Sequence, residues 1–190
     1  MSRSYSFEGR TLPTREQKSL AEVAPINDKG GFLWSCNFAI HAELFKGIDG
    51  FDERYPFPCM EDVDLRQRLE GCRKAFLFVP DALVLHPWRC RHPRTEIERY
   101  RESLGIFLSL HPARRSDFTA RSQLYGVARN ILREFVPGLL RYRGRGAANR
   151  VLYYWWCIIM IVRGLPDWRS RERSGTLGAA AHQKSDSGSV

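Results

Sequence analysis

Two adjacent carboxylates, Glu61 and Asp62, are the side chains of this sequence best placed to act as a base. They lie in an acid-rich stretch, residues 47–72, although the whole chain carries a net charge of +9. A loop containing Pro56 and Pro58 precedes them and a helical pattern follows, so both fall in the first turn of the predicted helix. Free amides and the helix dipole stabilise an ionised carboxylate there. Such a carboxylate can accept a proton from a hydroxyl group as a general base.

A structural role is the simplest alternative, because acids are common in the first turn of helices without any function. Asp62 precedes Leu65 and Leu69 by three and seven residues, so we expect it on the same, inward face of the helix. Asp64 is then expected to point elsewhere. An inward position would partly desolvate Asp62 and hold it in one orientation, and we therefore favour Asp62 over Asp64 as the base.

The elements around this helix are typical of an α/β protein. Strand and helix patterns alternate up to residue 90, and only helical patterns follow. The sequence therefore predicts an α/β unit with a helical C-terminal extension. The predicted division is an extended lead-in, the α/β unit, a basic amphipathic and apolar helical region, and a disordered tail: residues 1–29, 30–112, 113–169 and 170–190.

Charge and cysteine content restrict the kind of protein. Residues 1–90 carry a net charge of −1 and residues 91–190 a net charge of +10, so only the second half suits an anionic partner. This asymmetry argues against a chain that binds nucleic acid throughout. The five cysteines include no CxxC pair, and no apolar signal segment begins the sequence. Free thiols in a reducing, cytoplasmic compartment are the expectation.

An apolar run of twelve residues, 151–162, lies between Arg150 and Arg163. It is shorter than the ~20 residues that span a bilayer. Its aromatic start and flanking arginines predict an interfacial anchor on an anionic membrane surface, formed by residues 141–169. A buried core helix and a tilted span are the alternatives. The arginine-rich start, residues 141–150, could also contact RNA, but no folded nucleic-acid motif accompanies it.

Five short motifs follow one another through residues 30–112. They are the glycine pair Gly30–Gly31, the NFAI segment that begins at Asn37, the GFDE segment Gly50–Glu53, the MED segment Met60–Asp62, and the VPDALVLH segment that ends at His86. In this order and spacing the chain resembles the second half of a family 2 glycosyltransferase, an inverting enzyme with the GT-A fold. The resemblance implies a partial GT-A-like half-domain within the predicted α/β unit.

The resemblance also implies a reaction: transfer of a sugar, with inversion, from a nucleotide-sugar donor to a saccharide or lipid-linked acceptor at the inner membrane face. It makes Asp62 the base that deprotonates the acceptor hydroxyl, with Glu61 beside it. It places Gly30, Gly31, Asn37, Asp52 and Glu53 in substrate binding, and His86 as a ligand of Mg²⁺ or Mn²⁺ near the diphosphate.

The family's nucleotide-binding half, with its aspartate pair, has no counterpart in the sequence. The expectation is therefore a truncated enzyme that needs a separate donor-binding half. The alternative is a non-catalytic remnant that acts as a membrane-associated or nucleic-acid-binding basic module.

Overall fold

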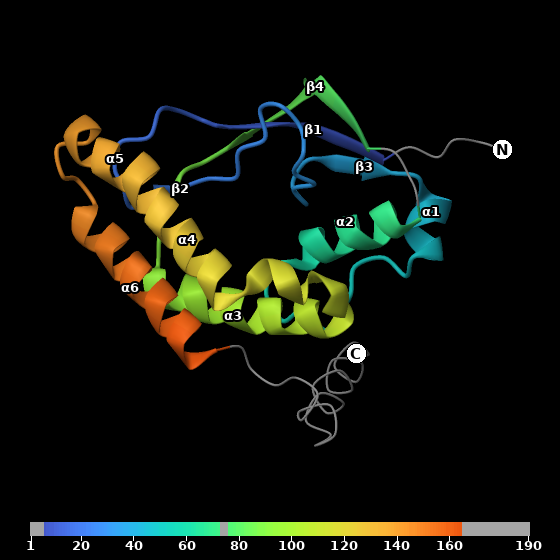
Figure 1. Ribbon diagram of the computed structural model, residues 1–190. Helices are drawn as coiled ribbons and strands as arrows, with labels where there is room; N and C mark the ends of the chain where they lie inside the picture. Colours follow the sequence, from blue (N-terminus) through green and yellow to red (C-terminus); the bar gives the residue numbers. More distant parts are fainter. Residues whose placement is uncertain (1–5, 73–75, 165–190) are drawn as a thin grey trace, which may run out of the picture.

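A computed structural model describes residues 6–72 and 76–164 of the chain (Figure 1). The strands are β1 (Ser6–Pro13), β2 (Glu22–Val23), β3 (Phe38–Ile40), β4 (Phe76–His86) and β5 (Arg89–Cys90). The helices are α1 (Ala42–Gly47), α2 (Glu61–Gly71), α3 (Pro93–Leu110), the 3₁₀ segment η1 (Pro112–Phe118), α4 (Ala120–Asn130), the π-helical segment η2 (Ile131–Phe135), α5 (Val136–Arg141) and α6 (Ala147–Arg163). The predicted α/β class with a helical C-terminal part is confirmed.

The main sheet has the order β3–β1–β4, with β1 antiparallel to β3 and parallel to β4. Its central strand, β1, comes from the segment expected to be an extended lead-in ahead of the α/β unit, and that expectation was wrong for residues 6–13, which belong to the sheet. The reason is that the buried positions of β1 include Ser6, Glu8 and Thr11, which are polar. A search for alternating apolar residues does not detect such a strand.

Strand β4 pairs with β1 in two registers. The pairing with β1 moves from Gly9 opposite Val79 to Arg10 opposite Leu83, so residues 80–82 have no partner on β1. This run begins with proline, which has no N–H to donate to a neighbouring strand. The result is a bulge in the middle of one long strand.

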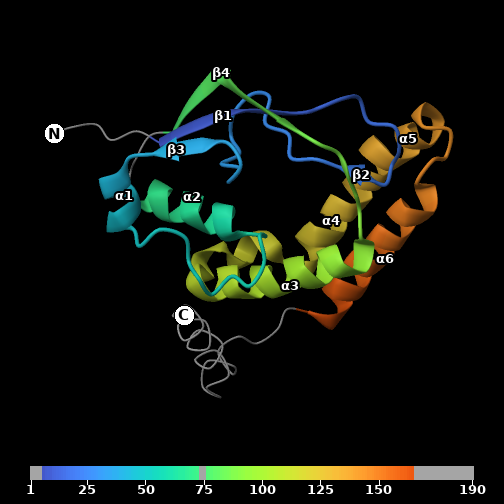
Figure 2. The same ribbon diagram turned by 180° about the vertical axis from the view of Figure 1, so that it is seen from behind.

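Helix α2 lies between the sheet and α3 in both views of the molecule (Figures 1 and 2). On the sheet side its Leu65 and Leu69 are fully buried and pack with Leu33 and the apolar side chains of β3 and α1. The predicted inward face of Leu65 and Leu69 is therefore confirmed. On the other side, α3 packs its own apolar face against Tyr55 and Met60 from the loop before α2.

The C-terminal helices form a separate packed group. Ile97 of α3 is buried against Cys157 and Met160 of α6, with Val127 of α4 beside them. The opposite side of α6 is exposed and apolar; its side chains are Val151, Leu152, Trp155, Ile158 and Val162. We call these five residues the outer face of α6. No helix in the described ranges is both long enough and apolar enough to cross a membrane.

Candidate functional site

The chain enters α2 through an unusual backbone conformation at Met60. This residue has a φ of 70°, in the left-handed region, and no side-chain hydrogen bond caps the helix there. A bulky residue in this region carries a strain of about 1 kcal/mol or more. Burial of the Met60 side chain against α3 compensates for that strain. The sharp turn starts the helix directly at Glu61, and strained residues of this kind concentrate at functional sites.

Both carboxylates that follow are partly buried. Burial raises the pKa of Asp62, and a hydrogen bond of 2.8 Å from the Val63 amide to its Oδ1 acts in the opposite direction. Burial also raises the pKa of Glu61, whose Oε2 atom is buried without a hydrogen-bond partner among the described residues. A partly desolvated carboxylate with a raised pKa binds a proton more readily than an exposed one, as a general base must.

Asp64 does not point away from the core, and the expectation that it would was wrong. Its side chain is 1% exposed, and its two oxygens lie 2.7 Å from Nε2 of His111 and 2.8 Å from Nε of Arg68. Arg68 also donates to the carbonyl of Ile48. Two faces of α2 are buried because the helix packs between the sheet and α3, and Asp64 lies on the second face. Its role is to join α2 to the end of α3.

The two loop acids predicted to bind substrate differ in their surroundings. Asp52 accepts hydrogen bonds from the backbone N–H of Arg54 (2.9 Å) and from its Nε and Nη2 atoms (3.0 and 2.7 Å). These bonds lower the pKa of Asp52 and hold the loop in a turn. Glu53 is exposed. A role for either residue in substrate binding stays a prediction.

The glycine pair is tied to both the sheet and α2. Gly30 and Gly31 have φ values of 80° and 102°, and a Cβ at Gly30 would lie 3.0 Å from Phe78. The Gly31 N–H donates to Glu8 Oε1 at 2.7 Å, and Arg66 of α2 donates to the Gly31 carbonyl. Glu8 is 4% exposed, with Oε2 3.9 Å from Arg66 Nη1. Glu8 was not among the residues predicted from the sequence. Its charged side chain, in a segment without a recognisable motif, was the one sign of a role.

Asn37 holds the bulge of β4 in place. Its side-chain amide donates to the main-chain carbonyls of Arg10 (2.9 Å) and Ala82 (2.8 Å). The main-chain carbonyl of Asn37 accepts a hydrogen bond from the Gly9 N–H (3.0 Å). A Cβ at Gly9 would lie within 2.5 Å of the Asn37 amide, which explains the glycine. Both amide hydrogens of Asn37 are therefore used by the main chain. Its predicted contact with substrate is untested.

Replacement of Asn37 by alanine is expected to lower the free energy of unfolding by about 1 kcal/mol, because the partly buried Arg10 carbonyl and the exposed Ala82 carbonyl lose their donor. Urea unfolding of the purified chain measures this change. Asn37→Asp provides a second variant, which keeps the shape but replaces the donor with an acceptor. An unchanged unfolding midpoint in Asn37→Ala would show that the bridge contributes nothing to the fold.

His86 ends β4, and both of its ring nitrogens lie close to other groups of the chain. Its Nδ1 is 2.8 Å from the carbonyl of Pro87, and its Nε2 is 3.2 Å from the guanidinium of Arg89. A neighbouring cation disfavours a metal ion at that nitrogen. Within residues 6–72 and 76–164 no three His, Cys, Asp or Glu side chains lie close enough together to hold a metal. These residues do not fit the expected Mg²⁺ or Mn²⁺, which stays a prediction.

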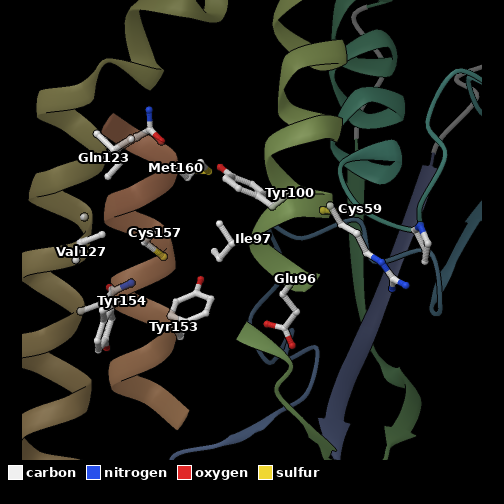
Figure 3. Close-up of a pocket in the computed structure, with 15 residues that line it drawn as sticks. Cys59, Glu96, Ile97, Tyr100, Gln123, Val127, Tyr153, Tyr154, Cys157 and Met160 are labelled. Atoms are coloured by element: carbon white, nitrogen blue, oxygen red, sulfur yellow. The ribbon is translucent and has the colours of Figure 1, made fainter. Parts of the chain in front are cut away.

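A cavity of about 470 Å³ lies between α3, α4 and α6 (Figure 3). Pro58 and Cys59, the last residues of the loop before Met60, form one of its walls. Burial and then the charges of Glu61 and Asp62 raise the pKa of the Cys59 thiol to about 11. The cavity therefore reaches the loop that positions the two carboxylates.

The amino-acid sequence is similar to that of an enzyme of known function. It is 32% identical over 102 residues to N-acetylglucosaminyl-diphospho-decaprenol L-rhamnosyltransferase of Mycobacterium tuberculosis, in strains CDC 1551 / Oshkosh and ATCC 25618 / H37Rv. The match covers 52% of this chain and 32% of the relatives, so the chain spans about a third of the length of the curated relatives it matches. No family model matches the chain. No solved structure matches it either. The similarity supports a resemblance to glycosyltransferases in general.

Proposed function

We propose that this chain is the acceptor-side part of an inverting, family 2-like glycosyltransferase of the GT-A fold, and that Asp62 is its base. The observation that carries the proposal is the pair Glu61–Asp62, partly buried with raised pKa values immediately after the strained Met60. The sequence similarity to a rhamnosyltransferase supports the same reaction class. The substrates we propose are a nucleotide-sugar donor and a lipid-linked saccharide acceptor, as the name of that relative suggests.

The chemistry follows from the position of one carboxylate. Asp62 accepts the proton of the acceptor hydroxyl while the hydroxyl oxygen attacks the anomeric carbon of the donor sugar. The bond from that carbon to the diphosphate breaks, and the nucleoside diphosphate leaves from the opposite side, so the configuration inverts. A positioned base of this kind contributes ~10²–10⁴-fold to the rate. Glu61 contributes a second partly desolvated carboxylate beside the base.

The donor-binding half is supplied separately in the test. The N-terminal part of the matched rhamnosyltransferase is fused ahead of this chain, and sugar transfer to an N-acetylglucosaminyl-diphospho-isoprenoid is measured for several nucleotide-sugar donors. We expect transfer by the fusion and little or none by either part alone. Failure of a folded fusion with every donor would contradict the proposal, and a product of retained configuration would contradict inversion.

We further propose that the chain acts in the cytoplasm at the inner face of a membrane. The outer face of α6 supports this proposal, because it exposes Trp155 (58%) and Val162 (81%) on a helix that begins at a cluster of arginines. Interfacial helices combine apolar burial with attraction to anionic headgroups. The same feature favours the second candidate function, a non-catalytic membrane-associated module.

The full chain is expected to sediment with vesicles that contain phosphatidylglycerol and not with vesicles of phosphatidylcholine alone. Added salt should weaken the binding without abolishing it, since only the electrostatic part is screened. Trp155→Gln with Val162→Gln should reduce binding by about 10²-fold or more, given ~1.5–3 kcal/mol for burying each large apolar side chain. Leu85→Gln, at an exposed position on β4, is the control. Equal binding to both vesicle types would contradict the membrane proposal.

A further inference from the structure

The cavity between α3, α4 and α6 has a mostly apolar lining. In Figure 3, Ile97 and Tyr100 of α3 face Cys157 and Met160 of α6, and Val127 of α4 lies on the far side. Its volume, about 470 Å³, lies within the range of small-molecule sites. Its lining includes Ile97, Val127 and Met160, and apolar clefts with a few polar groups are typical of small-molecule sites.

One lining residue of the cavity, Gly126, has no side chain to fill the space beside it. It lies in the middle of α4 and lines the cavity. A Cβ built there would meet no atom of the described chain within 4 Å, apart from its own helix backbone and chain neighbours. Glycine in a helix interior is about 1 kcal/mol less favourable than alanine. No close packing explains Gly126, and a larger side chain there would enter open space at the cavity lining.

The cavity reaches the loop that precedes the proposed catalytic residues. Cys59, in its wall, is three residues before Asp62, and the charges of Glu61 and Asp62 act on its thiol. Arg99, also in the lining, lies with its guanidinium 5.2 Å from the ring centroid of Phe57 in the same loop. A cation therefore lies at the cavity wall on the side of the loop that leads to Asp62.

We propose that this cavity binds the first isoprenoid units of the lipid-linked acceptor, with the diphosphate toward Arg99 and the acceptor sugar toward Asp62. This inference rests on the function proposed above. The cavity is too small for a long polyprenyl chain, so the remaining units leave it. The outer face of α6, on the opposite side of the same helix, provides an apolar surface for the units that leave the cavity.

One polar group in the lining favours a different occupant. The Oε1 atom of Gln123 is buried without a hydrogen-bond partner among the described residues, and a sugar hydroxyl could donate to it. Because most side chains in the lining are apolar, we favour the isoprenoid over a sugar as the occupant of the cavity. The experiment therefore includes a saccharide without lipid.

Binding is measured on the unmodified chain and needs no turnover. Farnesyl diphosphate, inorganic diphosphate and N-acetylglucosamine are titrated separately by calorimetry. Of the three ligands, only farnesyl diphosphate is expected to bind with a negative change in heat capacity, the sign of buried apolar surface. Gly126→Leu, which fills the cavity from α4, should weaken its binding at least about tenfold while the unfolding temperature stays the same or rises. Gly47→Leu, at another helical glycine with open space around it, is the matched control and should bind normally.

A second measurement protects the test against misfolding of the variant. Bound farnesyl diphosphate should slow alkylation of Cys59 in the wild-type chain, whereas alkylation of the exposed Cys36 should be unchanged. Equal affinity in Gly126→Leu and wild type, no protection of Cys59, or inorganic diphosphate binding as tightly as farnesyl diphosphate would overturn the proposal. Binding of N-acetylglucosamine that Gly126→Leu abolishes would assign the cavity to the sugar instead.

Failure of this inference is distinguishable from failure of the proposed function. If the fusion transfers sugar but Gly126→Leu leaves KM for the lipid-linked acceptor unchanged, the cavity is not the isoprenoid site and the enzyme assignment stands. If the chain binds farnesyl diphosphate in the cavity but no fusion transfers sugar, the cavity assignment stands without the catalytic one.

Discussion

Asp62→Asn is expected to reduce sugar transfer by the completed enzyme by about 10² or more, because asparagine keeps the shape of the side chain but cannot accept the proton. The fold should not suffer. Burial raises the pKa of Asp62, so its contribution to stability is present below the pKa of the unfolded chain and is lost as the pH rises through the folded pKa. At neutral pH the ionised carboxylate is unfavourable for folding, and its neutral replacement should unfold at the same or a higher temperature.

The pH dependence provides a further readout. The base works only when it is ionised, so kcat of the wild-type enzyme should rise with pH through the raised pKa of Asp62, and Asp62→Asn should lose this rise. Glu43→Gln removes an exposed first-turn acid from α1 and should leave transfer unchanged. Asp62→Asn could instead lose both stability and activity while its residual activity keeps the wild-type pH profile. This result would show that Asp62 supports the helix and is not the base.

Arg68→Met is expected to lower the free energy of unfolding by about 3 kcal/mol, because it leaves the Asp64 carboxylate buried with His111 as its one remaining partner among the described residues. Asp64→Asn should have an effect of similar size. The double variant should lose less than the sum of the two, since the pair is then removed together. Urea unfolding of the four proteins measures the coupling.

The matched control is Glu98→Gln, which breaks an exposed pair with Arg94 at the same helical spacing. Its effect should stay below about 0.5 kcal/mol. If Arg68→Met and Glu98→Gln changed stability equally, the Asp64 network would be no more important than a surface ion pair. Additive effects in the double variant would contradict a direct interaction between Asp64 and Arg68.

Local patterns predicted much of the helical structure. A glycine stands at the end of α1 and of α2, Gly47 and Gly71, and Ile97, Leu104 and Leu108 repeat at helical spacing along α3. In each case the signal lies within one or two turns of the chain, so no knowledge of distant partners is needed.

The features that the sequence did not reveal depend on partners far apart in the chain. Asp64 is buried because His111, 47 residues later, meets it, and helix periodicity alone assigned it to the wrong face. Glu8 is buried because it accepts the N–H of Gly31, 23 residues later. Polar groups are buried when a specific partner satisfies them, and a partner of this kind cannot be read from neighbouring residues.

The parallel pairing of β1 with β4 has a consequence for how the chain folds during synthesis. β1 ends at Pro13, and its parallel partner is complete only at His86. At ~5–20 residues per second, the ribosome needs several seconds to make the intervening segment. During that time one edge of the strand at the centre of the sheet is unpaired and open to association with other chains. The buried Ser6, Glu8 and Thr11 make that waiting strand more polar than most central strands, and this composition reduces its tendency to aggregate before β4 arrives.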